Sequence, residues 1–202
     1  MAYVLGFFAA DGTITIGKRK NHYIEFTSTD KKIIEAIRST LRSAHRISIR
    51  KRSHPWKTIF RLQIGSKTMV QDLMKFGFVP NKSKQLFYPH VPSRYLSNFT
   101  RGYFDGDGHV TMGIYPRNNR PSMNKVLTCG FTSGTKRFLK YLHNDLLQKK
   151  IVKGGTLHWH KGYRLNFAMH DSLGLYRFLY KDLDKKLYLP RKKKVFESFM
   201  RA

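Results

Sequence analysis

Apolar residues recur at two different spacings along the chain, and their order predicts the secondary structure. Short apolar runs occupy residues 3–10 and 99–105 and predict helices. After each run, apolar and polar residues alternate, which is typical of half-buried strands. The strands predicted from this alternation cover residues 13–19 and 22–27 in the first half and 109–115 and 125–132 in the second.

A helical spacing of apolar residues returns after these strands. Ile33, Ile34, Ile37 and Leu41 mark it in the first half, and Asp30 or Thr135 is placed to cap each helix. The remaining predicted elements are helices at 30–43 and 135–149, strands at 46–52, 58–64, 152–159 and 163–169, and helices at 66–76 and 171–182. The order αββαββα therefore occurs twice. We expect an α+β fold of two pseudo-symmetric half-domains, 1–92 and 93–202, each with an antiparallel sheet.

The two halves are related in sequence. Residues 3–12 read YVLGFFAADG and residues 99–108 read FTRGYFDGDG, so both contain G-[aromatic]-F-x-x-D-G. The offset between matched residues grows from 96 (Asp11 to Asp107) to 105 (Phe26 to Phe131). The second half thus has about nine extra residues, which we place in a longer hairpin loop within 115–125. Five matched landmarks in the same order indicate an internal duplication.

The charge of the chain indicates its partner. There are 39 Lys and Arg against 12 Asp and Glu, a formal net charge of +27. Like charges repel in a compact state, and a nucleic acid is the usual polyanion that relieves the repulsion. This reading is favoured over a membrane-surface protein. The 41% of hydrophobic residues exceeds what a disordered chain carries.

Cysteine use and the N-terminal run indicate the compartment. Cys129 is the single cysteine, so no intrachain disulfide can form, and a reducing intracellular compartment is expected. The apolar run at 3–10 is too short to span a bilayer, and no signal peptide is recognised before it.

The repeated G-[aromatic]-F-x-x-D-G stretches resemble the LAGLIDADG motif of homing endonucleases, and the resemblance covers essentially the whole chain. Small residues allow the two motif helices to pack closely, with Gly6, Ala9 and Ala10 facing Gly102 and Gly106. This packing would place Asp11 and Asp107 side by side. Two such carboxylates repel each other and need a cation between them. Hard oxygen ligands select Mg²⁺, which can activate water and stabilise the leaving oxygen in phosphodiester hydrolysis.

The resemblance implies further site residues. The backbone carbonyls of Ala10 and Gly106 would join Asp11 and Asp107 around two or three Mg²⁺ ions, with Mn²⁺ or Ca²⁺ able to substitute in binding. Lys82 and Lys192 match the family's active-site lysine, with Lys84, Lys193 and Lys194 left open as alternatives. Ser28 and Ser133 stand where some relatives carry a glutamine near the metals. Asp105 matches Ala9 in the first half and is expected to be peripheral.

Strand alternation predicts a DNA-contacting face on each sheet. Apolar positions such as Ile14, Ile16, Ile47 and Ile49 are assigned to the core, and the intervening polar residues to the other face. Arg suits guanine and Gln or Asn suits adenine, whereas lysines at hairpin tips suit phosphates. The predicted DNA contacts are Thr15, Lys18, Arg19, Tyr23, Glu25, Ser28, Ser48, Arg50, Arg52, Arg61, Gln63, Thr111, Tyr115, Thr128, Ser133, Arg164 and Asn166.

The sequence thus predicts a monomeric, Mg²⁺-dependent homing endonuclease that cuts both strands of a long asymmetric DNA site. An intron RNA maturase and a catalytically inactive DNA-binding regulator on the same fold remain alternatives, and a ribosomal protein is a third. Both aspartates are present, which favours the nuclease. No intein splicing block is recognised, which favours an intron origin.

Overall fold

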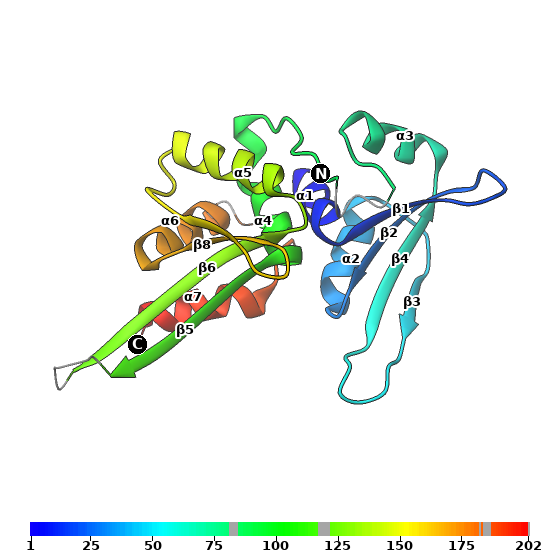
Figure 1. The fold of residues 1–202 in the computed structure, drawn as a ribbon. Helices are drawn as coiled ribbons and strands as arrows, with labels where there is room; N and C mark the ends of the chain where they lie inside the picture. Colours follow the sequence, from blue (N-terminus) through cyan, green and yellow to red (C-terminus); the bar gives the residue numbers. More distant parts are fainter. Residues whose placement is uncertain (81–84, 117–121, 182, 184–186, 202) are drawn as a thin grey trace.

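The computed structural model describes residues 1–80, 85–116, 122–181, 183 and 187–201, and it contains two similar α+β halves (Figure 1). The first half comprises α1 (Ala2–Asp11), β1 (Gly12–Ile16), β2 (His22–Ser28), α2 (Lys31–Thr40), β3 (Ile47–Arg50), β4 (Ile59–Gly65) and α3 (Lys67–Lys75). The second comprises a 3-10 turn η2 (Ser93–Tyr95), α4 (Leu96–Asp107), β5 (Gly108–Pro116), β6 (Met123–Ser133), α5 (Lys136–Gln148), β7 (Thr156–Trp159), β8 (Tyr163–Phe167), α6 (Met169–Tyr180) and α7 (Pro190–Arg201). The predicted fold class is confirmed.

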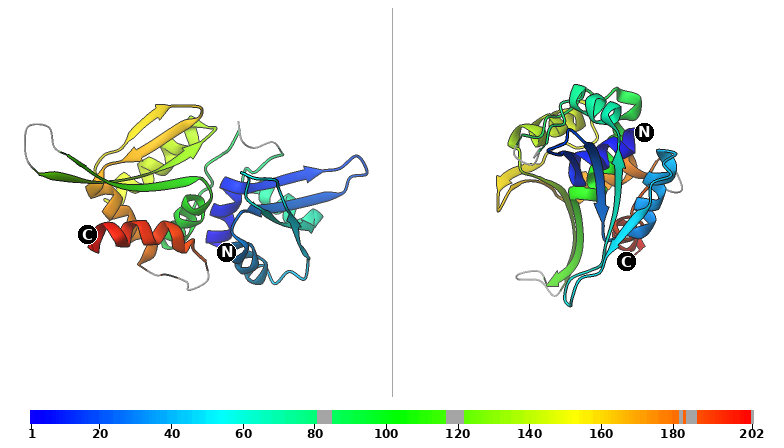
Figure 2. Two further views of the ribbon diagram at one scale, coloured as in Figure 1. Left: turned by 90° about the horizontal axis from the view of Figure 1, so that it is seen from below. Right: turned by 90° about the vertical axis from the view of Figure 1, so that its right-hand side faces the viewer.

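Each half contains one four-stranded antiparallel sheet. The strand orders are β1-β2-β4-β3 and β5-β6-β8-β7, so the two sheets have the same topology. One face of the first sheet carries Ile24, Phe26, Leu62 and Ile64, all buried. Helices α2 and α3 pack against this sheet, and α5, α6 and α7 pack against the second one. The two sheets lie on either side of α1 and α4 (Figures 1 and 2).

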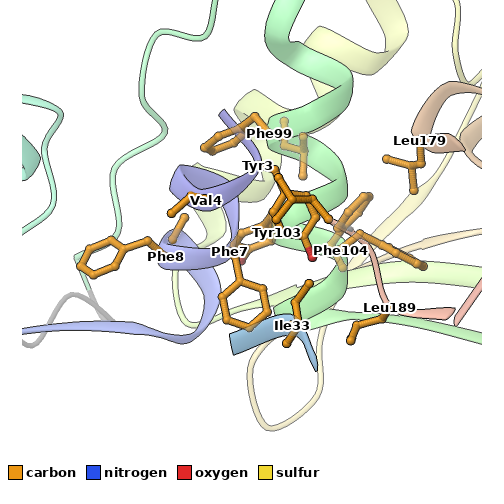
Figure 3. Packing of buried hydrophobic residues seen from close by; sticks show 14 of the residues in the cluster. Tyr3, Val4, Phe7, Phe8, Ile33, Phe99, Tyr103, Phe104, Leu179 and Leu189 are labelled. Atoms are coloured by element: carbon orange, nitrogen blue, oxygen red, sulfur yellow. The ribbon is translucent and has the colours of Figure 1, made fainter. Parts of the chain in front are cut away.

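The centre of the molecule is the contact between α1 and α4. Aromatic side chains from both helices are at most 1% exposed and belong to one continuous core (Figure 3). They are Tyr3, Phe7, Phe8, Phe99, Tyr103 and Phe104. Burying such large apolar surfaces provides most of the driving force that holds the two halves together.

The structure differs from the sequence prediction at the C-terminus. Residues 190–201 form α7, which was not predicted because its first turn is the basic run Arg191 to Lys194. Its apolar positions are few, but Phe196 and Phe199 are buried against the second half. Pro190 begins the helix, where its missing N–H removes no hydrogen bond.

The prediction of a longer second hairpin loop is wrong. Strands β5 and β6 have 9 and 11 residues, whereas β1 and β2 have 5 and 7. Eight of the nine extra residues therefore lengthen the strands. Two apolar positions assigned to the core are also exposed, Ile16 by 44% and Ile49 by 57%. Ile16 is the last residue of β1, and Ile49 lies on the edge strand β3, where fewer neighbours can cover a side chain.

Asp30 and Thr135 occupy the N-cap positions of α2 and α5, as predicted, but neither side chain makes a capping hydrogen bond.

The predicted boundary between residues 92 and 93 stays a prediction. Among the described residues, no helix is both long and apolar enough to cross a membrane.

Candidate functional site

The two motif helices end in the same way. Helix α1 ends at Asp11 and α4 at Asp107, and a glycine in extended conformation follows each. The N–H of Gly12 donates to Phe8 O, and the N–H of Gly108 donates to Phe104 O. A Cβ at Gly12 would lie 2.1 Å from the Phe8 ring, and one at Gly108 would lie 2.3 Å from the Phe104 ring. A glycine after each aspartate is therefore a steric requirement of these helix ends.

The helices approach each other through reciprocal glycine contacts. A Cβ at Gly6 would lie 2.0 Å from Phe99 O, and a Cβ at Gly102 would lie 2.0 Å from Tyr3 O. The same offset of 96 residues relates both members of each pair, so the contact has twofold pseudo-symmetry. Backbone thus packs directly on backbone, as the small residues of the motif predict.

The carboxyl ends of the helices converge. A Cβ at Gly106 would lie 2.3 Å from Ala10 Cβ and 3.2 Å from Asp11 Oδ2, so the Asp11 carboxylate lies against α4. Asp11 and Asp107 are both half-buried. Burial raises the pKa of Tyr103 well above its usual value, and the charges of both Asp107 and Asp11 add to this. One buried phenol therefore lies within electrostatic reach of both carboxylates.

These groups fit a hard divalent cation. Two carboxylates at the negative ends of two helix dipoles attract positive charge, and Mg²⁺ characteristically binds one or two carboxylates together with waters and substrate phosphate. Within the described ranges no cluster of three or more His, Cys, Asp or Glu side chains forms a metal-binding group. The donor set thus suits a shared Mg²⁺ site between Asp11 and Asp107, to which Ala10 and Gly106 are adjacent.

Lys192 lies beside this site but is fully engaged by the protein. The residue is 5% exposed, and its ammonium donates to Phe104 O at 2.5 Å, Asp105 O at 2.8 Å and Gly108 O at 2.6 Å. Burial lowers its pKa to about 8, although the charges of Asp105, Asp11 and Asp107 oppose that shift. An ammonium has three donors, and all three go to carbonyls around the end of α4. Its predicted counterpart, Lys82, lies outside the described residues.

Asp105 joins this buried group, contrary to the expectation that it is peripheral. It is 2% exposed, and its Oδ2 accepts from Tyr3 Oη at 2.6 Å and from the N–H of Leu189 at 3.0 Å. Burial raises its pKa to about 6. Asp105 thereby links α1 with the segment that leads into α7. Its match with Ala9 in the first half gave no sign of this role.

The first sheet presents polar side chains on the face opposite its buried residues. Strand pairing places together the side chains that alternate with the core positions, namely Thr15, Tyr23, Glu25, Ser48, Arg50, Arg61 and Gln63. Lys18 and Arg19 lie in the β1–β2 turn, whereas a strand position was predicted for Arg19. Arg52 lies beyond the end of β3, and its guanidinium stacks 4.6 Å from the centre of the Trp56 ring.

The second sheet presents a corresponding face. Thr111, Tyr115, Thr128, Arg164 and Asn166 lie on it, as predicted. The hydroxyls of Thr111 and Thr128 are 2.9 Å apart and share a hydrogen bond. His109 also lies on this face, two residues after Asp107, and sequence reasoning missed it. The available signal was its place in the alternation with Val110.

The assignment of Ser28 and Ser133 to the DNA-contacting face is wrong. Each follows a buried phenylalanine by two residues, and strand periodicity therefore puts both on the core side. Ser133 is 4% exposed. The Oγ of Ser28 accepts from the N–H of Asp30, and that of Ser133 accepts from the N–H of Thr135, so both serines shape the turns into α2 and α5.

The chain thus contains two α+β repeats, each with a four-stranded antiparallel sheet, joined through a pair of glycine-packed helices that end in aspartate. Residues 1–75 match the model of the LAGLIDADG-like domain. The N-terminal part of the chain is thus similar to the LAGLIDADG-like domain, and the whole chain has the fold of the LAGLIDADG meganucleases.

Solved structures extend the similarity to the whole chain. The meganuclease I-AabMI bound to uncleaved DNA has a TM-score of 0.65 and 15% identity over 98% of this chain and 88% of that one. I-SmaMI bound to cleaved DNA gives 0.67 and 12% over 99% and 87%, and I-LtrWI bound to target DNA gives 0.63 and 13% over 99% and 88%. At these identities the likeness is one of fold. A search of curated proteins found no match.

Proposed function

We propose that the protein is a Mg²⁺-dependent endodeoxyribonuclease that hydrolyses both strands of a long, asymmetric double-stranded DNA site. The observation that carries this proposal is the convergence of Asp11 and Asp107, brought together by the glycine contacts of α1 and α4. The net charge of +27 supplies the attraction to a polyanion. Since both aspartates belong to one chain, a monomer is sufficient.

Asp11 and Asp107 would hold the Mg²⁺ ions, and the carbonyls of Ala10 and Gly106 are proposed to assist. Bound Mg²⁺ supplies an activated water and charge stabilisation at the leaving oxygen. One aspartate from each repeat serves each strand of the duplex, so the twofold arrangement of the helices matches the two scissile phosphates. The bond between Tyr103 Oη and Thr132 O, 2.8 Å long, fixes α4 against β6 next to the site.

Lys192 receives a positioning role in this proposal. Its three hydrogen bonds leave no donor for a phosphate, and they fix the end of α4 from which Asp107 projects. A direct catalytic role for Lys82 stays a prediction.

The exposed sheet faces are proposed to bind the DNA on both sides of the cleavage site. Residues on the strands would contact bases in the grooves, and Lys18, Arg19 and Arg52, at the hairpin ends, would contact phosphates. The structures of I-SmaMI with cleaved DNA, and with uncleaved DNA in the presence of calcium ions, support both the choice of partner and the choice of a divalent cation.

The test is cleavage of a randomised double-stranded DNA library with Mg²⁺ by the wild type and by Asp11→Asn and Asp107→Asn. We expect the wild type to cut one long asymmetric site and each variant to bind that site without cutting both strands. Asp72→Asn is the matched control, because Asp72 lies on the surface of α3 and pairs only with Lys75 among the described residues. A wild type that binds DNA or intron RNA in Mg²⁺ but never cuts DNA would replace the nuclease by the regulator or the maturase.

A further inference from the structure

The two sheets carry a matched pair of polar residues whose surroundings differ. In the first sheet, Gln63 pairs with Glu25 across β4 and β2, and Arg61 lies two residues before Gln63. In the second sheet, Asn166 pairs with Gly130 across β8 and β6, and Arg164 lies two residues before Asn166. The duplication thus matches Arg61 with Arg164 and Gln63 with Asn166, but it matches Glu25 with Gly130.

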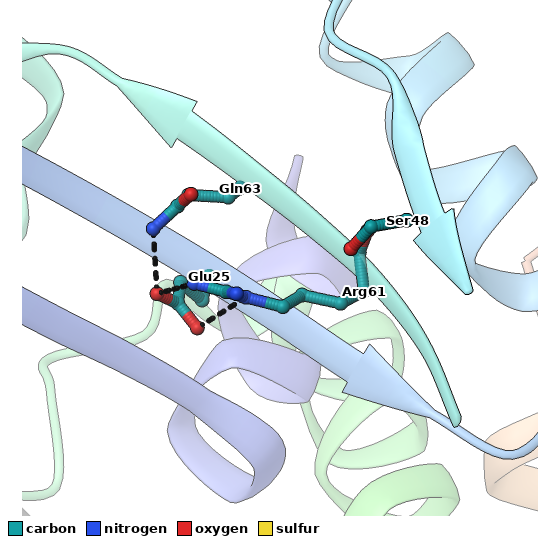
Figure 4. A network of polar contacts seen from close by, with 4 residues as sticks. All are labelled: Glu25, Ser48, Arg61 and Gln63. Atoms are coloured by element: carbon teal, nitrogen blue, oxygen red, sulfur yellow. Dashed lines mark hydrogen bonds and ion pairs between the residues drawn. The ribbon is translucent and has the colours of Figure 1, made fainter. Parts of the chain in front are cut away.

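In the first sheet, Glu25 engages both partners (Figure 4). Arg61 donates from Nε to Oε2 at 2.8 Å and from Nη2 to Oε1 at 2.5 Å, and Gln63 donates from Nε2 to Oε1 at 2.8 Å. The Glu25 side chain is 16% exposed and that of Arg61 is 41% exposed, so the carboxylate of this bidentate ion pair is largely shielded while the arginine stays partly open to water. The trio has no net charge, and two guanidinium nitrogens of Arg61 are already used.

In the second sheet, no side chain can occupy the position of Glu25. A Cβ at Gly130 would lie 2.3 Å from Leu165 O, 2.7 Å from Asn166 Oδ1 and 2.8 Å from His109 Cε1. Arg164 Nε and Asn166 Oδ1 are buried atoms without a hydrogen-bonding partner in the described part of the chain. Burial lowers the pKa of the His109 imidazole, the charges of Arg164 and Lys192 add to this, and the neighbouring Asn166 opposes it. No hydrogen bond of normal geometry reaches Asn166 Oδ1 in the described part of the chain.

A buried donor and a buried acceptor that lack partners are unfavourable, and a ligand removes this cost once the two side chains turn toward the exposed face. Among the described residues no ion pair opposes this movement at Arg164, whereas Glu25 holds Arg61. Both atoms lie in the second sheet beside His109, which follows Asp107 by two residues. The ligand chemistry that complements an arginine and a neighbouring amide is a base edge or a phosphate of DNA.

We propose that Arg164 and Asn166 are specificity-determining residues that contact DNA directly, whereas Glu25 holds Arg61 and Gln63 and so reduces their contribution to binding. The two halves of the target are then read unequally. The half bound by the second sheet is recognised more strictly at the base pairs next to the cleavage site. This inference rests on the proposed DNA-binding function, and it requires no cleavage.

The experiment measures DNA affinity at several salt concentrations, with Ca²⁺ in place of Mg²⁺, on the site that the wild type selects from a randomised duplex library. Three variants are compared: Arg164→Met, the double variant Glu25→Gln/Arg61→Met, and Glu25→Gln. The pair is removed as a unit, because Arg61→Met alone would leave a carboxylate facing the DNA. Methionine keeps much of the apolar stem of arginine, and thermal unfolding checks that each variant is folded.

We expect Arg164→Met to weaken binding about tenfold or more and to lose sequence preference in one half-site only. The charge-matched double variant should lose clearly less affinity than Arg164→Met, since it removes a pair that is already engaged and neutral. Glu25→Gln should release Arg61 and steepen the salt dependence by about one phosphate contact. Equal losses in Arg164→Met and the double variant, or an unchanged salt dependence in Glu25→Gln, would overturn the inference. If the wild type itself selects no DNA, it is the proposed function that fails.

Discussion

Replacing Gly6 by alanine tests whether the backbone contact between α1 and α4 sets the geometry of the aspartate pair. The new Cβ would lie 2.0 Å from Phe99 O and 2.8 Å from Phe99 C, both backbone atoms that no rotamer change can move. A normal Cβ to oxygen contact needs about 3.2 Å, so the helices must separate by roughly 1 Å. That shift loosens the buried aromatic side chains of both helices.

The magnitude follows from two opposing effects. Overpacking of a tight interior costs about 1–3 kcal/mol, and a contact with rigid backbone belongs at the upper end. Alanine also raises helix propensity by about 1 kcal/mol over glycine. We therefore expect Gly6→Ala to lower the free energy of unfolding by about 2 kcal/mol. A displacement of about 1 Å between Asp11 and Asp107 would also reduce the proposed cleavage about a hundredfold.

Denaturant unfolding and cleavage of the selected site are the two assays. Gly17→Ala is the control, because the nearest atom to a Cβ there is 3.8 Å away. Gly102→Ala should behave like Gly6→Ala, and the double variant should cost less than the sum, since one separation of the helices relieves both contacts. A Gly6→Ala protein with the stability of the wild type, or fully additive effects, would refute this account of the interface.

Three further predictions follow from buried polar groups. Lys192→Met should destabilise the fold by about 3 kcal/mol or more in denaturant unfolding, because it leaves three carbonyls at the end of α4 without their donor and removes a positive charge near the buried Asp105. Lys193→Met removes only the half-buried pair with Glu197 and should cost under about 1 kcal/mol; equal effects would contradict the assignment. Tyr3→Phe should lower the free energy of unfolding by about 2 kcal/mol, because it removes a hydrogen bond to the buried Asp105. Tyr88→Phe should lower it by less, because its hydrogen bond goes to the less buried Asp145. Burial raises the pKa of Cys129 to about 12 from 9.0, so at pH 8 the native thiol should react with a disulfide reagent about a thousandfold more slowly than the unfolded chain; rapid native labelling would show that the thiol is accessible.

Periodicity predicted most of the fold because the sheets have one buried and one exposed face. The seven elements of each repeat occur in the predicted order, and the duplicated motif placed Asp11 and Asp107 correctly at the ends of paired helices. Helix α7 was not predicted from the sequence because the apolar residues it buries are Phe196 and Phe199. Two such residues after a basic first turn do not form a recognisable helical pattern. Nothing local in a sequence distinguishes a helix that covers a sheet with two aromatic residues from a solvated basic tail.

The candidate site was predicted less fully, for a different reason. Arg101 is an example. In so basic a chain an arginine is expected at the surface, yet Arg101 is 0% exposed. It donates hydrogen bonds to Leu187 O, Leu179 O and Asn98 Oδ1. The partners of Arg101, Asp105 and Lys192 lie up to 102 residues away in the chain and are backbone groups or single side chains. Such partners leave no periodic or motif signal, so only the structure could separate Lys192 from its neighbours.

Some matched positions carry the same residue in both repeats and others do not, and the place of each residue in the structure explains which. Gly6 and Gly102 lie at the pseudo-twofold contact, where each touches the backbone of the opposite helix, so a larger side chain in either repeat separates both. Away from the pseudo-twofold axis, matched positions have different neighbours, and there the two repeats differ in sequence. Glu25 matches Gly130, and Ala9 matches Asp105. The proposed DNA site, with two unlike halves, would place different demands on the two sheets but the same demand on the aspartate pair. Symmetry is therefore expected to persist at the helix contact and to be lost on the recognition surfaces.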